Sequence, residues 1–250
     1  MLRNVAIGTG IAFALAAGIA IAGTPLGDGD DSGFVPPTKD NLKCETSISK
    51  AAAKTGAAII VCHGKSAGAQ LALKTFDEEG CETAAISKYT AAASKVASLC
   101  PPCLNAAAII NTAETQLDGA ANAVIFCDST SGAHLGDGDD LGWVPADKTK
   151  LKCQAGFAKN IGKVEFAIAI CHIKGATLQF KQKTFDEEGC ENTALGKFDA
   201  ANAKLTGCPA CMAPLLGAGV FGPTIESNVD KSSSGTYCAS PSGAFLADLR

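Results

Sequence analysis

The sequence predicts an all-α protein made of two tandem helical bundles, each of three to four helices and each stapled by disulfides. Three observations lead to this class. The nonapeptide KTFDEEGCE occurs at 74–82 and again at 183–191, inside a longer repeat. The chain has 12 cysteines, six in each copy of that repeat. Apolar residues recur at intervals of three and four, which is the helical period, and no segment alternates as a strand does.

The repeat is long enough to be a domain. A shift of 109 residues aligns 27–81 with 136–190, and 29 of these 55 positions are identical. Such a period exceeds that of a solenoid unit and suits one small domain per copy. We therefore expect an internal duplication, with the first six-cysteine domain at 23–132 and the second at 133–250.

Residues 1–22 have the pattern of a signal peptide. Arg3 precedes an apolar run from Val5 to Ala22, which ends in Ala-Ile-Ala before Gly23. The alternative is an uncleaved anchor, because about 18 apolar residues just span a bilayer. No later segment is apolar enough to cross, so we expect no transmembrane span after signal removal. The protein is then secreted, periplasmic or held at the cell surface.

The charge and the motifs exclude several classes. Removing Arg3 with the leader leaves 20 basic and 25 acidic residues, and nucleic-acid-binding domains are normally basic. The sequence has no phosphate loop, no H-E-x-x-H and no C-x-x-C-H. We expect no nucleotide, no haem and no nucleic-acid partner, and we assign no catalytic residue.

Two helices are predicted at the start of each copy. The segment 39–73 lacks proline, and its counterpart shows one apolar face. KTFDEEGCE then starts a second helix that runs to about Leu99, with Thr75 and Glu78 as a capping box and negative charge in the first turn. The alternative for FDEE is a carboxylate catalytic site. A third helix is expected at about 103–117.

An antiparallel hairpin of the first two helices predicts disulfides, because facing residues have a constant sum of residue numbers. Cys171 with Cys190 and Cys153 with Cys208 both give 361. The corresponding sums in the first copy are 143 and 144. Export makes disulfides the expected state of these cysteines. The six predicted pairs are Cys44–Cys100, Cys62–Cys81, Cys153–Cys208, Cys171–Cys190, Cys103–Cys127 and Cys211–Cys238.

The C-x-x-C sequences CPPC at 100–103 and CPAC at 208–211 carry an enzymatic alternative. This spacing occurs in thiol-disulfide oxidoreductases, in which a low-pKa thiol begins a helix after a strand. The strand is missing here, and the hairpin places the two cysteines of each motif in separate bridges. Structural cysteines are therefore the favoured interpretation.

The histidines and acidic loops offer cation ligands. His63 and His172 each follow a cysteine and are expected near the acidic start of the second helix, either as partly exposed histidines paired with a carboxylate or as ligands of zinc or copper. GDGDDSG and GDGDDLG resemble the first half of a calcium loop, but position 12 is lysine instead of glutamate. The loops predict either a weak calcium site, completed by the neighbouring domain, or a solvated linker. The candidate ligands are Asp28, Asp30, Asp31, Asp137, Asp139 and Asp140.

A lysine stripe on the first helix of each copy is the remaining candidate site. Arginine is absent between Arg3 and Arg250, and the lysines of the stripe share one helical face. They form either a face for an anionic polymer or a solvated surface. The candidate residues are Lys43, Lys50, Lys54, Lys152, Lys159 and Lys163.

Two function classes follow from the sequence. The first is an exported, non-enzymatic binding or structural module, with weak calcium sites at the acidic loops before each domain. The alternative is a secreted thiol-disulfide oxidoreductase that uses CPPC and CPAC. The sequence contains no recognisable set of catalytic residues, which favours the first class.

Overall fold

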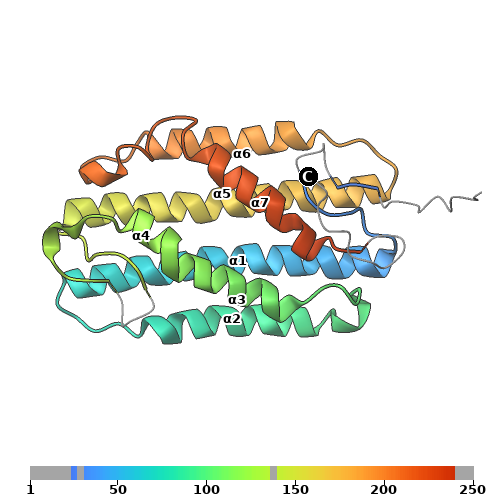
Figure 1. Cartoon of the computed structure of the whole chain (residues 1–250), viewed down its shortest axis with the longest axis horizontal. Helices are drawn as coiled ribbons and strands as arrows, with labels where there is room; N and C mark the ends of the chain where they lie inside the picture. The colour runs from blue at the N-terminus through green and yellow to red at the C-terminus, as the bar shows by residue number, and fades with distance from the viewer. Residues whose placement is uncertain (1–23, 27–30, 136–139, 240–250) are drawn as a thin grey trace, which may run out of the picture.

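Four long helices form the body of the protein. The computed structural model describes residues 24–26, 31–135 and 140–239. Helices α1 (Lys39–Leu71) and α5 (Lys148–Phe180) pack against each other in the middle and run in opposite directions (Figure 1). Helix α2 (Glu78–Ser94) flanks α1, and α6 (Glu187–Asn202) flanks α5. The all-α class is therefore confirmed.

Of the shorter elements, α3, α4 and α7 cross one face of this layer (Figure 1). In the described part of the chain, the only β pairing is two isolated bridges, Pro25 with Phe34 and His134 with Trp143. The shorter elements are η1 (Ala97–Leu99), α3 (Ala106–Gln116), the π-helical turn η2 (Leu117–Ala121), α4 (Asn122–Ile125), η3 (Ser129–Ser131), η4 (Ala210–Met212) and α7 (Gly222–Thr236).

Local chemistry sets the ends of the helices. The Thr38 hydroxyl accepts the backbone N–H of Asn41 and caps α1. The Asp147 carboxylate accepts two backbone N–H groups and caps α5. The second helix is shorter than the predicted end at Leu99, because a 3-10 turn replaces its last residues and leads directly into the Cys100 bridge.

No helix within the described ranges combines the length and the apolar character that a membrane crossing requires. The predicted signal peptide at 1–22 lies outside the described residues.

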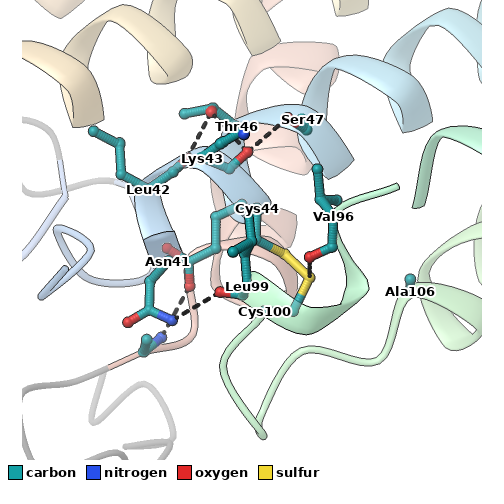
Figure 2. Close-up of a disulfide and its surroundings, with 12 residues drawn as sticks. Asn41, Leu42, Lys43, Cys44, Thr46, Ser47, Val96, Leu99, Cys100 and Ala106 are labelled. Carbon is teal, nitrogen blue, oxygen red and sulfur yellow. Dashed lines mark hydrogen bonds between the residues drawn. A yellow bond between two sulfur atoms is a disulfide. The ribbon is translucent and has the colours of Figure 1, made fainter. Parts of the chain in front are cut away.

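Every cysteine of the chain is in a disulfide, and the four predicted hairpin pairs are present. Figure 2 shows the Cys44–Cys100 bridge between the start of α1 and the turn after α2. Beside it, the Asn41 side chain donates to the carbonyl of Leu99 at 3.3 Å. The constant-sum argument works because α1 with α2, and α5 with α6, are antiparallel hairpins.

The predicted pairs Cys103–Cys127 and Cys211–Cys238 are wrong. The structure joins Cys103 to Cys238 and Cys127 to Cys211, so both bonds link one copy of the repeat to the other. The reason is that these four cysteines lie beyond the hairpins, where the constant-sum argument does not apply. The segments that carry them cross the helical layer and meet segments of the opposite copy.

The apolar core also spans both copies. Ile60 and Phe126 of the first copy belong to the same cluster as Phe157 and Ile168 of the second. A second, smaller cluster is formed by residues of the first copy alone, among them Ile48. Separate cores for 23–132 and 133–250 are therefore not what the structure shows. Each half alone also lacks two disulfide partners.

The cross-links between the copies predict how the cut chain behaves. A protease site inserted in the exposed turn 129–132 should nick the chain without separating its halves, because Cys103–Cys238 and Cys127–Cys211 still join them. Electrophoresis with and without reductant measures this. Halves that separate without reductant would contradict the pairing.

A buried acid distinguishes the two copies. Glu45 is fully buried in α1, and its carboxylate accepts the backbone N–H of Ala239 at 3.3 Å. The position 109 residues later is Gln154, which is also fully buried and donates to the carbonyl of Ile125. Burial raises the pKa of Glu45 to about 8 against the opposing backbone hydrogen bonds. Below about pH 8, Glu45 is therefore protonated and uncharged, as the glutamine at the matching position, Gln154, always is.

Replacing Glu45 by glutamine should stabilise the protein at alkaline pH. Because the folded-state pKa of Glu45 is raised, its contribution to stability is present below pH 4.5 and is lost as the pH rises through about 8. Glutamine does not titrate, so Glu45→Gln should gain on the order of 2–4 kcal/mol at pH 9. Denaturant unfolding at pH 4 and pH 9 measures the difference. An equal gain at both values would contradict this origin.

Candidate metal centres

Four buried carboxylates from three other parts of the chain surround His63, and we call these five residues the His63 centre. Its Nε2 atom lies 3.6 Å from an oxygen of Glu78 and 2.8 Å from one of Glu82. The same nitrogen lies 3.3 Å from an oxygen of Asp118 and 3.3 Å from one of Asp140. All five residues are buried. One imidazole thus faces four carboxylates that are shielded from water.

The second copy repeats the arrangement around His172, and we call this set the His172 centre. Its Nε2 atom lies 3.8 Å from an oxygen of Glu187 and 2.8 Å from one of Glu191. Oxygens of Asp31 and Asp230 lie at 3.0 and 3.3 Å. The two histidines occupy matching places in the last thirds of α1 and α5. Because these helices are antiparallel, the centres lie toward opposite ends of the molecule (Figure 1).

The nonapeptide KTFDEEGCE supplies two of the four carboxylates of each centre. The Cys62–Cys81 bridge joins the residues next to His63 and Glu82 and so brings this pair together. Glu78 precedes Glu82 by one helical turn, which places both carboxylates on one face of α2. The Cys171–Cys190 bridge does the same beside His172. Of the residues of FDEE, Glu78 joins the His63 centre, and a catalytic role of these carboxylates stays a prediction.

The predicted capping box is wrong in its residues. The cap of α2 is Asp77, whose carboxylate accepts the backbone N–H of Gly80 at 2.9 Å, and Asp186 does the same for Gly189. A Cβ atom at Gly80 would collide with the Asp77 side chain, so the glycine belongs to the cap. Glu78 is not available as a capping partner, because it points into the His63 centre.

Each acidic loop contributes one aspartate to the centre of the other copy. Asp31, which precedes α1, joins the His172 centre, and Asp140, which precedes α5, joins the His63 centre. Backbone hydrogen bonds fix both loops, from Ser32 to the carbonyl of Asp230 and from Leu141 to that of Asp118. The other proposed ligands, Asp28, Asp30, Asp137 and Asp139, lie outside the described residues.

Sequence reasoning missed Asp118 and Asp230. Asp118 lies in the π-helical turn η2, where Gly119 leaves the helical conformation at φ −80° and ψ −115°. Such turns are frequent at functional sites, because they redirect one side chain out of the regular helical register. Asp230 lies in the middle of α7. The repeat alignment slips in this region, so no matching spacing pointed to the two residues.

Hydrogen bonding alone does not explain these distances. An imidazole nitrogen carries at most one proton and donates one hydrogen bond, whereas four carboxylate oxygens converge on each Nε2. In a metal site, two ligand atoms about 2.1 Å from the ion and at right angles are about 3.0 Å apart. The observed 2.8–3.8 Å separations are of this size. The potential ligand atoms form two groups of three around each histidine, and each group shares the Nε2 atom and has the spacing of metal ligands.

Ser233 orients the ring of His172. Its hydroxyl lies 2.8 Å from Nδ1 of His172 and also donates to the carbonyl of Val229 at 3.2 Å. Since the hydroxyl proton is directed to Val229, Nδ1 is assigned as the donor to Ser233. In the neutral ring, Nε2 then presents a lone pair to the carboxylates, as a metal ligand does.

Without a cation, the centres retain protons. Burial lowers the pKa of His63, but Asp118, Glu82 and Asp140 outweigh it and raise that pKa to about 10. The carboxylates around His172 likewise overcome burial and raise its pKa to about 12. Burial, reinforced by neighbouring carboxylates, raises the pKa of Glu78 to about 9. These raised pKa values mean that both centres favour bound protons, because positive charge offsets the repulsion between the carboxylates.

The histidines are buried, at 2% and 1% exposure, which corrects the expectation of partly exposed side chains. Zinc or copper binding by these residues is untested. The third histidine, His134, is separate from both centres and stacks on Trp143 with ring centroids 4.1 Å apart.

The remaining candidate residues lie elsewhere. Cys100 and Cys103 are in different disulfides, as are Cys208 and Cys211. The lysines of the proposed anion-binding face are all exposed, and none forms part of either centre. They are Lys43, Lys50, Lys54, Lys152, Lys159 and Lys163.

Searches against models of protein families, curated proteins and solved structures found no match to this chain. The geometry of the two centres is therefore the basis for inferring a function.

The melting temperature of the chelator-treated protein should fall as the pH rises from about 5 to about 10. The folded-state pKa values of His63 and Glu78 are raised above 6.5 and 4.5, so the fold favours the protonated groups and loses their contribution at high pH. Thermal melts across this range measure the slope.

A variant pair isolates the centres from other titrating groups. Glu78→Gln combined with Glu187→Gln should flatten the slope, because an amide does not ionise. Glu79→Gln combined with Glu188→Gln changes the adjacent acids outside the centres, of which Glu79 is exposed and Glu188 is half-buried, and should leave the slope intact. Equal slopes in the two double variants would contradict this origin of the pH dependence.

Proposed function

We propose that the protein is an exported, non-enzymatic binding module that holds one metal cation in each of its two centres. The observation that carries the proposal is the convergence of four carboxylate oxygens on one buried imidazole nitrogen, twice in one chain. Buried charges in proteins are normally paired or coordinate metals. One imidazolium balances only one of four carboxylates, whereas a bound, multiply charged cation balances more of them.

The donor atoms indicate the class of cation. Each centre offers carboxylate oxygens and one imidazole nitrogen, and all cysteines are in disulfides, so no thiolate is present. Hard oxygen donors with one imidazole suit ions such as Mn²⁺, iron or Zn²⁺ and disfavour Cu⁺. Calcium at the acidic loops remains the competing proposal, supported by Asp31 and Asp140. An imidazole ligand is unusual for calcium, which favours the first group of ions.

A bound cation also has a structural role in this proposal. Each centre contains an aspartate from the loop that precedes the other copy, so an ion there ties the two copies together. Together with the two disulfides between the copies, this supports an internal duplication whose products act as one unit. The predicted signal peptide and the disulfides support export to a secreted, periplasmic or cell-surface location.

Two further proposals from the sequence remain. The exposed lysines of α1 and α5 are a candidate face for an anionic polymer at the cell surface. The alternative function, a thiol-disulfide oxidoreductase, needs CPPC or CPAC to form a reactive pair. Each of those cysteines is instead bonded to a distant partner, which supports the binding module.

The proposal predicts two bound ions per chain after equilibration with Mn²⁺ or Zn²⁺ and removal of the free metal. His63→Ala should leave one ion and His63→Ala with His172→Ala none, with affinity at each altered centre reduced by more than about 100-fold. Elemental analysis of the dialysed protein measures the stoichiometry.

His134→Ala is the matched control. It removes the third histidine, which stacks on Trp143 and lies in neither centre, and should retain both ions. Circular dichroism confirms that each variant is folded. Wild-type protein that binds neither ion nor Ca²⁺ would contradict the proposed function.

A further inference from the structure

One turn of α7 holds both ring nitrogens of His172. A carboxylate oxygen of Asp230 lies 3.3 Å from Nε2, and the hydroxyl of Ser233 lies 2.8 Å from Nδ1. The two residues are three positions apart in α7 and therefore project from the same face of the helix. Both are buried. Rotation of the imidazole about its bond to Cβ would break both contacts, so the ring has one preferred orientation.

The His63 centre lacks the contact that Ser233 makes. Asp118 has the role of Asp230 in this centre, with an oxygen 3.3 Å from Nε2 of His63. The third residue after Asp118 is Ala121, which has no hydroxyl. Here a neighbouring side chain supports a carboxylate instead, since Asn122 donates to Asp140 at 3.1 Å. The two copies therefore support different ligands, the imidazole in one and a carboxylate in the other.

Support of the imidazole affects every position that an ion can take in a centre. Around His172, one group of three potential ligand atoms includes the glutamates of α6, and the other includes the two aspartates. Both groups contain Nε2, so an ion in either group requires the ring in the same orientation. Asn122 supports one aspartate, and therefore only one of the two groups around His63. The contact of Ser233 is thus the more general of the two.

We infer that Ser233 is a positioning residue that gives the His172 centre the higher metal affinity, so that this centre fills before the His63 centre. This inference rests on the proposed function and specifies the order in which the two centres bind their ions. A hydrogen bond at the second ring nitrogen fixes the orientation of a ligating histidine. A ring that is held before the ion arrives also loses less conformational freedom on binding.

Two variants of the full chain make the centres separately measurable. His63→Ala leaves the His172 centre intact, and His172→Ala leaves the His63 centre intact. Equilibrium dialysis against Mn²⁺, and in a second series against Zn²⁺, gives the affinity of each remaining centre. His63→Ala should bind its ion about tenfold or more tightly than His172→Ala does, because only the His172 centre has the support of Ser233. Circular dichroism establishes that both variants fold.

Serine variants then assign the difference to one hydroxyl. Ser233→Ala added to His63→Ala should weaken binding about tenfold or more, and added to His172→Ala it should leave binding unchanged. Ser233→Thr keeps the hydroxyl and should restore most of the affinity, which a purely steric role of the side chain would not predict. The control is Ser232→Ala, because the exposed Ser232 hydroxyl donates to the same carbonyl of Val229 at 2.8 Å and should not affect binding.

The outcomes separate this inference from the function on which it rests. Equal affinities in the two single-centre variants, or tighter binding by the His63 centre, would leave metal binding intact and overturn the order of filling. Loss of affinity in Ser233→Thr as large as in Ser233→Ala, or an equal loss in Ser232→Ala, would overturn the role of the Ser233 hydroxyl. If the unaltered protein binds neither Mn²⁺ nor Zn²⁺ nor Ca²⁺, the proposed function itself fails.

Discussion

The burial of eight carboxylates around two imidazoles is the constraint on which the rest of the structure depends. Such clusters repel internally and lose hydration, so they need rigid support and positive charge. The support is covalent, because a disulfide joins the positions next to the histidine and the second glutamate in each centre. The long helices α1 and α5 then hold the two centres apart. The disulfides that stabilise the two hairpins therefore also hold the residues of the two centres together.

The two copies form one structural unit, because the acidic loop before each copy contributes to the centre of the other. Each centre is incomplete without an aspartate from the other copy, and two disulfides and a shared apolar cluster follow the same pattern. The copies are nevertheless not equivalent. Glu45 in one corresponds to Gln154 in the other, and Ser233 orients His172. The two centres therefore have different surroundings.

The parts of the structure that depend on contacts within one hairpin could be predicted from the sequence, and those that depend on contacts between distant segments could not. Helical period and cysteine spacing predicted α1, α5 and the four hairpin disulfides, because all of these depend on local geometry. The bonds of Cys103 and Cys127 depend on where distant segments meet, which spacing within one copy does not reveal. The sequence explains Glu78 equally well as part of an acidic first turn, which is normal chemistry at a helix start, so it did not mark Glu78 and Glu82 as candidate ligands. Asp118 and Asp230 lie where the repeat slips, so no pattern marked them.

Diffraction from crystals of the metal-loaded protein, recorded at the absorption edge of the bound ion, tests the central claim most directly. The account predicts two anomalous peaks per chain. One should lie between Nε2 of His63 and the carboxylates of Glu78 and Glu82, and the other should lie at the equivalent place beside His172. Peaks confined to exposed acids, or protein without a peak at either histidine, would contradict it.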